Sequence, residues 1–202
     1  MNSKSVTITL LAIAVVLLLS LTLYFLNENI KIENSKRQLS REIAMMSVRE
    51  FSFDLNNTMT GLKAPPDVVC ITRDNDEKYL SELTNGRAIL IYRYMQAGGC
   101  RPCYEEQIRL LQEIFKNIPQ STAILASYSS RRDFRISARD NVSEILMLYI
   151  PSNAFDWQFE QSSIPYFFVL HPCLRISNIF VPNKHEPELT RRYLESIKRL
   201  LQ

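Results

Sequence analysis

The pattern of hydrophobic and polar positions divides the 202-residue chain into an apolar N-terminal stretch, a polar middle and a longer alternating region. The apolar stretch begins at Val6, ends at Leu26 and carries no charged residue. As an α-helix it rises about 30 Å, enough to cross the hydrocarbon core of a bilayer. A cleaved signal peptide would have a shorter apolar region that ends in small residues, which the sequence before Asn27 lacks. The pattern therefore predicts a transmembrane signal anchor within residues 1–27.

The polar middle, residues 28–61, is rich in helix-forming residues. Apolar side chains recur along it at helical spacings, at Ile32, Leu39, Ile43 and Met46. This pattern predicts a short amphipathic stalk, and the repeat is too brief to predict a coiled coil. Gly61 and the pair Pro65-Pro66 are helix breakers. We therefore expect a folded domain to begin near Leu62 and to cover residues 62–202.

The third region alternates between strand-like and helix-like segments. Short apolar runs with β-branched or aromatic residues predict strands at residues 68–71, 87–95, 121–128, 146–150, 166–170 and 176–181. Amphipathic segments predict helices at residues 102–117, within 131–148 and at 187–201. The run 87–95 is apolar on both faces, so we expect it at the centre of a sheet. Alternating strands and helices that end in a hairpin and a helix predict an α/β fold.

Charge and cysteine content narrow the range of functions. The formal net charge is only +3 and the basic residues are spread along the sequence, so we expect no nucleic-acid partner. Four cysteines are too few for a scaffold built on disulfides. One close pair, Cys100 and Cys103, with two distant single cysteines, Cys70 and Cys173, indicates a reactive site. We expect the two single cysteines to be packing or incidental residues.

The cysteine pair follows a strand and a short turn and opens a helix. Unpaired backbone N–H groups and the positive end of the helix dipole favour a thiolate at Cys100. Pro102 suits the first helical turn, where its missing N–H costs nothing. Cys103 lies three residues on, on the same face. We therefore expect Cys100 to attack a disulfide and Cys103 to resolve the intermediate.

Two other readings of the pair remain open. Half of a zinc site has the same spacing, but zinc needs a second pair of ligands, and Cys70, Cys173, His171 and His185 are scattered. An inert structural disulfide is the other alternative. The strand–turn–helix context favours redox chemistry, which needs no metal and no cofactor because the two sulfurs carry the electrons.

Residues 88–111, which include the Cys100-Arg101-Pro102-Cys103 motif, resemble the core of the thioredoxin superfamily. The chain is most similar to the membrane-anchored, TlpA-like thiol-disulfide oxidoreductases, over residues 62–202. The resemblance implies a thioredoxin-like fold, a central mixed sheet flanked by helices, behind the N-terminal transmembrane helix. Residues 163–170 match the family's later motif, in which Pro165 would be a cis-proline that faces the cysteines. The backbone of Ile164 would then pair with a substrate chain.

The sequence departs from the family just before the first cysteine. Gly99 stands where an aromatic residue is usual, so the substrate range and redox potential do not carry over. This departure supports the alternative function, a non-catalytic thioredoxin-like binding module or a carrier of copper or another metal. Copper carriers usually have three residues between their cysteines, whereas this motif has two, which argues against a copper carrier. A peroxiredoxin has a threonine three residues before its nucleophilic cysteine, and Ala97 at that position argues against a peroxiredoxin.

These observations predict an oxidoreductase that acts on disulfides or thiols of extracytoplasmic proteins. A membrane-borne or soluble redox partner would restore its redox state, and the anchor would hold it in the inner membrane with its domain in the periplasm.

The distribution of charge around the apolar stretch predicts the opposite orientation. Lys4 precedes the apolar stretch, whereas Lys31, Lys36, Arg37 and Arg41 follow it, and positive charge favours the cytoplasmic side.

Overall fold

The computed structural model describes residues 3–97, 101–140 and 144–202. Within these ranges, the description excludes the side chains of residues 3–19 and of Arg41, Ala44, Met45, Arg101, Cys103, Asp140 and Gln158. The expected nucleophile Cys100 lies outside the described residues, as does the side chain of Cys103. The chain forms two units, Met1–Met46 and Ser47–Gln202.

The first unit is part of one helix, α1 (Ser3–Met59), which continues through the expected junction between anchor and stalk. Ion pairs one turn apart lie on its exposed surface, Lys31 with Glu28 at 2.9 Å and Arg37 with Glu33 at 2.8 Å. No helix in the described part of the chain is long and apolar enough to cross a membrane. Most side chains of the expected span, residues 6–19, lie outside that part.

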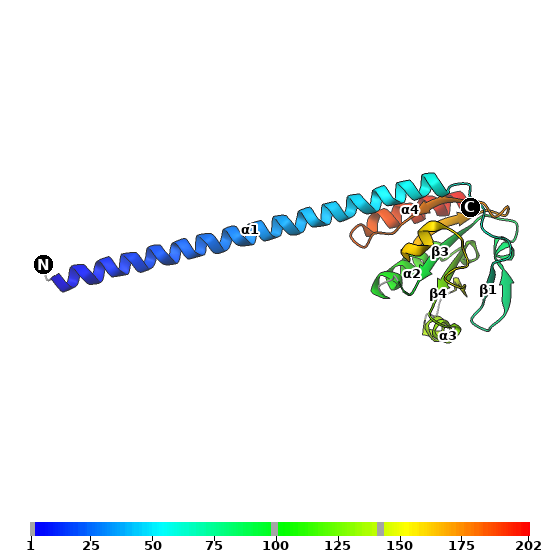
Figure 1. Ribbon diagram of the computed structural model, residues 1–202, viewed down its shortest axis with the longest axis horizontal. Helices are drawn as coiled ribbons and strands as arrows, with labels where there is room; N and C mark the ends of the chain where they lie inside the picture. The colour runs from blue at the N-terminus through cyan, green and yellow to red at the C-terminus, as the bar shows by residue number, and fades with distance from the viewer. Residues whose placement is uncertain (1–2, 98–100, 141–143) are drawn as a thin grey trace. The chain divides into compact units, whose positions relative to one another are not determined.

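The second unit is built on a seven-stranded sheet in the order β2-β1-β5-β4-β3-β6-β7 (Figure 1). The strands are β1 (Val69–Ile71), β2 (Glu77–Tyr79), β3 (Ile89–Met95), β4 (Thr122–Ser127), β5 (Leu146–Tyr149), β6 (Tyr166–Leu170) and β7 (Ile176–Phe180). Strands β3, β4 and β5 run parallel, and the other pairings are antiparallel. The expected mixed sheet is confirmed, as is the hairpin formed by β6 and β7.

Every residue of β3 is buried, so this strand is central, as its apolar pattern predicts. Because successive side chains point to opposite faces, the strand contributes to two cores. Leu90 and Tyr92 pack beneath α2 (Arg101–Phe115), α3 (Arg131–Asp140) and α4 (Pro187–Leu201). Ile89 and Ile91 face the opposite core.

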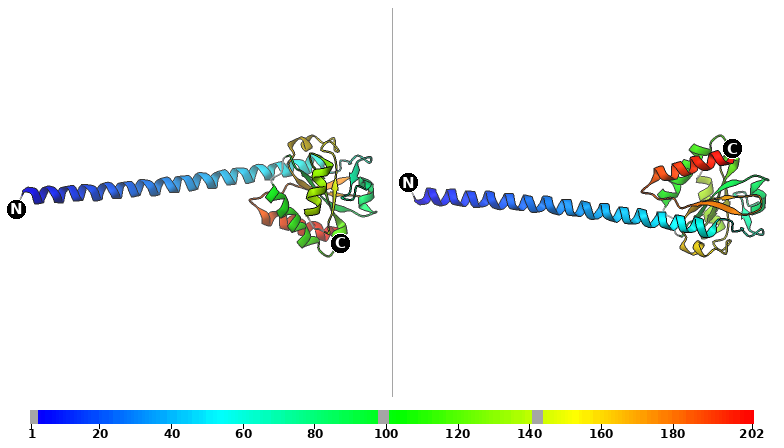
Figure 2. Two further views of the ribbon diagram at one scale, coloured as in Figure 1. Left: turned by 90° about the horizontal axis from the view of Figure 1, so that it is seen from below. Right: turned by 90° about the horizontal axis from the view of Figure 1, so that it is seen from above.

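The last turns of α1 cover that opposite core. Leu55 and Met59 are buried there, and Figure 2 shows this end of α1 and α4 on opposite sides of β7. The compact unit therefore begins at Ser47, earlier than the boundary near Leu62 that helix breakers predict. The reason is that the helix end carries apolar side chains that the sheet needs as a cover.

Side chains of α1 also pair with the edge strand β7 and its continuation. The N–H of Ile179 donates to Asn56 Oδ1, and the N–H of Val181 donates to Ser52 Oγ, both at 3.1 Å. Arg49 forms an ion pair with Glu186 nearby. Edge strands otherwise present unpaired backbone groups, so this end of α1 completes the sheet as well as covering it.

Candidate functional site

The expected redox turn joins the central strand to α2. Strand β3 ends at Met95, and α2 begins at Arg101, so the backbone of Cys103 lies in the first helical turn. The predicted strand–turn–helix context is thus confirmed for the described residues on both sides of Cys100. Pro102 is exposed in this first turn, where proline is tolerated because early N–H groups lack helical partners.

Backbone contacts connect the start of this turn to the neighbouring strand. Gln96 N–H donates to the carbonyl of Ser127 at 2.9 Å, which extends the pairing of β3 with β4. The Gln96 side chain accepts a hydrogen bond from Ser129 N–H at 3.4 Å. Because α3 begins at Arg131, the start of α3 lies beside the redox turn.

Aromatic rings hold the first turn of α2 against the sheet. Tyr104, which follows Cys103, is 3% exposed and stacks on Tyr94 with ring centroids 4.1 Å apart. Tyr92 stacks in turn on Phe167 of β6 at 4.6 Å. Burial raises the pKa of Tyr104 and of Tyr92, so both phenols stay neutral. The helix that carries Cys103 is therefore fixed by a rigid aromatic contact.

The expected substrate-binding residues Ile164 and Pro165 lie next to the end of β3. Strand β6 begins at Tyr166, which pairs with Arg93, so Pro165 lies near the level of Tyr94. Ile164 is 37% exposed and available to a partner, and its N–H donates to Ser162 Oγ at 3.4 Å. The structure thus brings Ile164 and Pro165 to the strand that leads into the cysteine pair.

The expectation that Pro165 has a cis peptide bond is wrong. No peptide bond among the described residues is cis, so the bond before Pro165 is trans. Two residues before Pro165, Ser163 adopts a left-handed conformation (φ 54°) after the 3₁₀ helix Gln158–Ser162. Its N–H donates to the carbonyl of Glu160 at 3.1 Å, and the chain then enters β6 in an extended form.

A buried ion pair joins the same two segments. Arg93 is 0% exposed, and its guanidinium donates to both carboxylate oxygens of Glu160 at 2.8–3.1 Å. The hydroxyl of Tyr166 also donates to Glu160, and Arg93 lies over the ring of Phe155, 5.8 Å from its centroid. A buried charge is tolerated only when it is paired and hydrogen-bonded in this way.

Sequence reasoning missed this pair. The sequence did carry one signal: Arg93 is a charged residue inside the apolar run 87–95, which was expected to be a central strand. A charge buried in such a strand requires a partner. The identity of that partner had no local signal, because Glu160 lies 67 positions away.

A cavity of about 520 Å³ opens beside this ion pair. Its lining comes from the end of β3, the 3₁₀ helix and the preceding loop: Met95, Ser152, Asn153, Phe155, Asp156, Trp157, Glu160, Gln161 and Ser163. The cavity therefore adjoins the segment that presents Ile164. Its floor is aromatic, because Phe155 stacks on Trp157 with centroids 4.2 Å apart.

The two single cysteines have contrasting environments. Cys70 lies in β1 and is 0% exposed, and its burial raises the pKa of its thiol to about 12. Cys173 is exposed in the β6–β7 turn, and both are free thiols. The described residues contain no group of three or more His, Cys, Asp or Glu side chains that could hold a metal ion.

Sequence comparison identifies no known relative: no family model matches the chain, and no curated protein matches it. Similar folds occur among solved structures. A candidate thiol:disulfide interchange protein DsbE from Chlorobium tepidum is 16% identical with a TM-score of 0.51, and covers 71% of this chain and 98% of its own. A candidate protein disulfide isomerase from Bacteroides thetaiotaomicron is 15% identical with a TM-score of 0.52, over 70% of this chain and 89% of its own. Ser47–Gln202 therefore has a thioredoxin-like α/β fold, with a mixed sheet flanked by helices.

Proposed function

We propose that this chain is a thiol-disulfide oxidoreductase whose reactive groups are Cys100 and Cys103. The observation that carries the proposal is that the sequence of the Cys-x-x-Cys motif runs into the start of α2, directly after the central strand β3. Solved structures with a similar fold are candidate thiol:disulfide interchange and disulfide isomerase proteins, which supports the same chemistry.

In the reducing direction, the Cys100 thiolate attacks one sulfur of a substrate disulfide and forms a mixed disulfide. The other substrate sulfur leaves as a thiolate and takes a proton. The Cys103 thiolate then attacks Cys100, which releases the second substrate thiol and leaves a Cys100–Cys103 disulfide. Two electrons pass from the cysteine pair to the substrate, and the oxidising direction is the reverse of these steps. The start of α2 favours the thiolate that each step requires.

The substrate is proposed to be an extracytoplasmic polypeptide held by the backbone of Ile164, beside Pro165. The apolar stretch from Val6 to Leu26 would anchor the protein in the inner membrane, with the domain in the periplasm. A membrane-borne or soluble redox partner would return the cysteine pair to its starting state.

Reduction of insulin disulfides by the full chain, with dithiothreitol as the electron source, tests the activity. We expect turnover above the uncatalysed rate, its abolition by Cys100→Ser, and accumulation of a trappable mixed disulfide with Cys103→Ser. Cys173→Ser is the matched control, because it removes an exposed thiol outside the motif, and it should leave the rate unchanged. A fully reduced wild-type protein no more active than Cys100→Ser would overturn the proposal and favour a non-catalytic binding module or metal carrier.

A further inference from the structure

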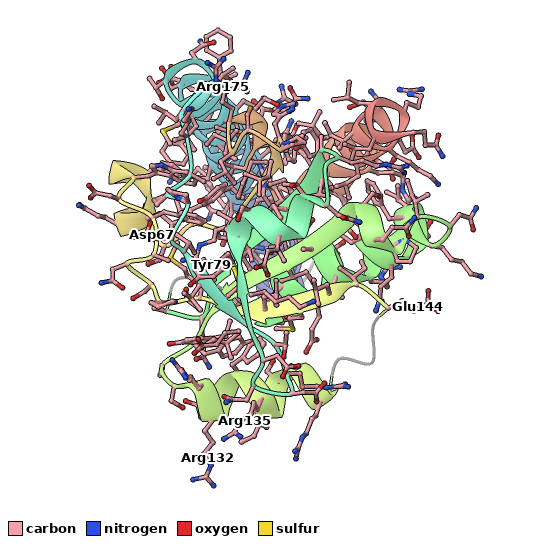
Figure 3. All side chains as sticks on the ribbon, turned by 90° about the vertical axis from the view of Figure 1, so that its right-hand side faces the viewer. Asp67, Tyr79, Arg132, Arg135, Glu144 and Arg175 are labelled. Atoms are coloured by element: carbon pink, nitrogen blue, oxygen red, sulfur yellow. The ribbon has the colours of Figure 1, made fainter. Side chains whose placement is uncertain are left out.

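Helix α3 presents a face made of arginine side chains. Arg131, Arg135 and Arg139 are spaced by four residues and so share one side of the helix, with Arg132 beside them; all four are exposed. The opposite side carries Phe134 and Ala138, which are buried in the core with α2 and α4. Figure 3 shows Arg132 and Arg135 extending from α3 away from the sheet. We call these four residues the arginine face.

This arrangement works against the stability of the helix itself. Like charges four residues apart repel, which applies to Arg131 with Arg135 and to Arg135 with Arg139. Positive side chains in the first turn also oppose the helix dipole. Among the side chains that the structure describes, which exclude that of Asp140, no carboxylate forms an ion pair with the arginine face. Asp133, the acid in the first turn, is held by Ser130 at 2.8 Å instead.

The helix that carries the arginine face begins near Gln96, the first residue after β3. Ser129, two residues before α3, donates its N–H to the side chain of Gln96, and Gln96 follows the last residue of β3. Strands β3 and β4 are parallel, so the redox turn and the start of α3 leave the sheet at the same edge. A polypeptide whose disulfide occupies the redox turn therefore passes within reach of the arginine face.

We propose that the arginine face binds an acidic segment of the polypeptide whose cysteines exchange with Cys100 and Cys103. The guanidinium group presents a planar fork of donors that matches a carboxylate in two hydrogen bonds. Ile136, 53% exposed beside the arginines, adds an apolar contact to the same surface. The inference rests on the proposed redox function and names its substrate class: disulfide or dithiol polypeptides with acidic residues close to a cysteine.

A polypeptide fits this surface better than a membrane or a nucleic acid does. The face spans one ten-residue helix, about 15 Å long, which suits a short acidic segment. Its helix also begins at the sheet edge where β3 leads into the redox turn, the place at which a polypeptide substrate would dock. The protein's net charge is only +3, far from the general basicity that lipid or nucleic-acid binding favours.

The test compares two disulfide-linked peptides that differ only in residues near one cysteine, three glutamates in one and three glutamines in the other. The full chain should reduce the glutamate peptide about five- to twentyfold faster in kcat/KM at low salt. The ratio should approach one near 1 M salt, where charge interactions extend only about 3 Å. Arg131→Gln/Arg135→Gln/Arg139→Gln should abolish the preference and leave kcat for the glutamine peptide unchanged.

The matched control changes three other exposed basic residues, Arg87, Lys116 and Arg192, to Gln. It alters the net charge equally and should keep the preference, which separates a local site from a general charge effect. Equal reduction of both peptides by the wild type would overturn this inference and leave the redox function standing. Failure to reduce either peptide would overturn the redox function itself. Arginine-dependent binding to anionic lipid vesicles, with no preference between the peptides, would assign the face to a membrane and also overturn the inference.

Discussion

Arg93 and Glu160 tie the two segments of the candidate site together at the level of single residues. Arg93 belongs to the strand that leads to Cys100, and Glu160 belongs to the 3₁₀ helix that precedes Ile164 and Pro165. Their side chains are 0% and 4% exposed, so neither charge has water as an alternative partner. The pair therefore joins β3 to the 3₁₀ helix that precedes the segment proposed to bind substrate.

Glu160→Gln should destabilise the fold strongly, because it leaves the Arg93 charge buried without its counter-ion. The expected loss is about 3–5 kcal/mol of the free energy of unfolding. Arg93→Met/Glu160→Leu should lose much less, since well-packed apolar residues can replace a buried ion pair at little cost. Urea denaturation followed by fluorescence of Trp157, the single tryptophan, measures both.

The matched control for this prediction is Glu113→Gln, which breaks the exposed pair with Arg191. Its denaturation midpoint should stay close to that of the wild type, because exposed pairs are screened by water. If Glu160→Gln were as stable as Glu113→Gln, the proposed role of the buried pair would be wrong.

The contrast between Cys70 and Cys173 gives a second prediction at this scale. Alkylation requires a thiolate, and with a pKa of about 12 only roughly one Cys70 thiol in ten thousand is ionised at pH 8. In a Cys100→Ser/Cys103→Ser background, iodoacetamide at pH 8 should modify Cys173 and spare Cys70. Peptide mass spectrometry measures the two sites separately. Both should react in 6 M guanidinium, and equal labelling without denaturant would show that Cys70 is accessible.

At the scale of elements, the last turns of α1 belong to the fold that carries the cysteine pair. Leu55 and Met59 are 6% and 7% exposed against the sheet, and Asn56 accepts a hydrogen bond from β7. Burial of each apolar side chain contributes about 1.5–3 kcal/mol. Residues 47–59, the last part of the expected stalk, therefore belong to the domain.

A fragment of residues 47–202 should fold cooperatively, whereas residues 62–202 should be less stable by several kcal/mol or should show no cooperative transition. The shorter fragment exposes the apolar core that Leu55 and Met59 cover, and it leaves backbone groups of β7 unpaired. Urea denaturation of both fragments, with the full chain as reference, tests this. Equal midpoints for the two fragments would contradict the assigned role of α1.

Elements with a strong local pattern were predictable from the sequence. The apolar run 87–95 contains β3. The amphipathic segment 102–117 overlaps α2, and 187–201 coincides with α4. The β6–β7 hairpin follows its turn signal. The short exposed strand β2 has no such pattern, because it is set by its pairing with β1. The end of α1 at Met59 lies close to the predicted helix breakers, but the start of the compact unit at Ser47 was hidden, since long-range contacts decide it.

Features of the site that depend on tertiary contacts were less accessible to sequence reasoning. The position of Ile164 and Pro165 beside β3 was predictable from a motif, but the trans bond was not, because the motif implies a cis bond before this proline. The arginine face was also missed. Three of its arginines have helical spacing in the sequence, but the burial of Phe134 and Ala138 is what shows that this side of α3 is the exposed one.

At the scale of the whole molecule, two signals disagree about the side of the membrane on which the domain lies. The basic residues that follow the apolar stretch favour the cytoplasm. The thioredoxin-like fold, with a cysteine pair and an expected N-terminal anchor, favours a domain in the periplasm, where disulfides form and persist. The proposed substrate class depends on the outcome, because acidic polypeptides with disulfides are abundant only on the oxidising side.

Cys173 can report the orientation, because it is exposed whereas Cys70 is buried. In intact cells that produce the Cys100→Ser/Cys103→Ser variant, a membrane-impermeant maleimide should label Cys173 before lysis. The protein should remain in the membrane fraction after a high-salt wash, and removal of residues 1–27 should release it. Adding Cys173→Ser should abolish the labelling, which excludes reaction at Cys70.

Labelling that appears only after lysis would place the domain in the cytoplasm. The charge count would then be the correct guide, and the cysteine pair would work in a reducing compartment on transient disulfides.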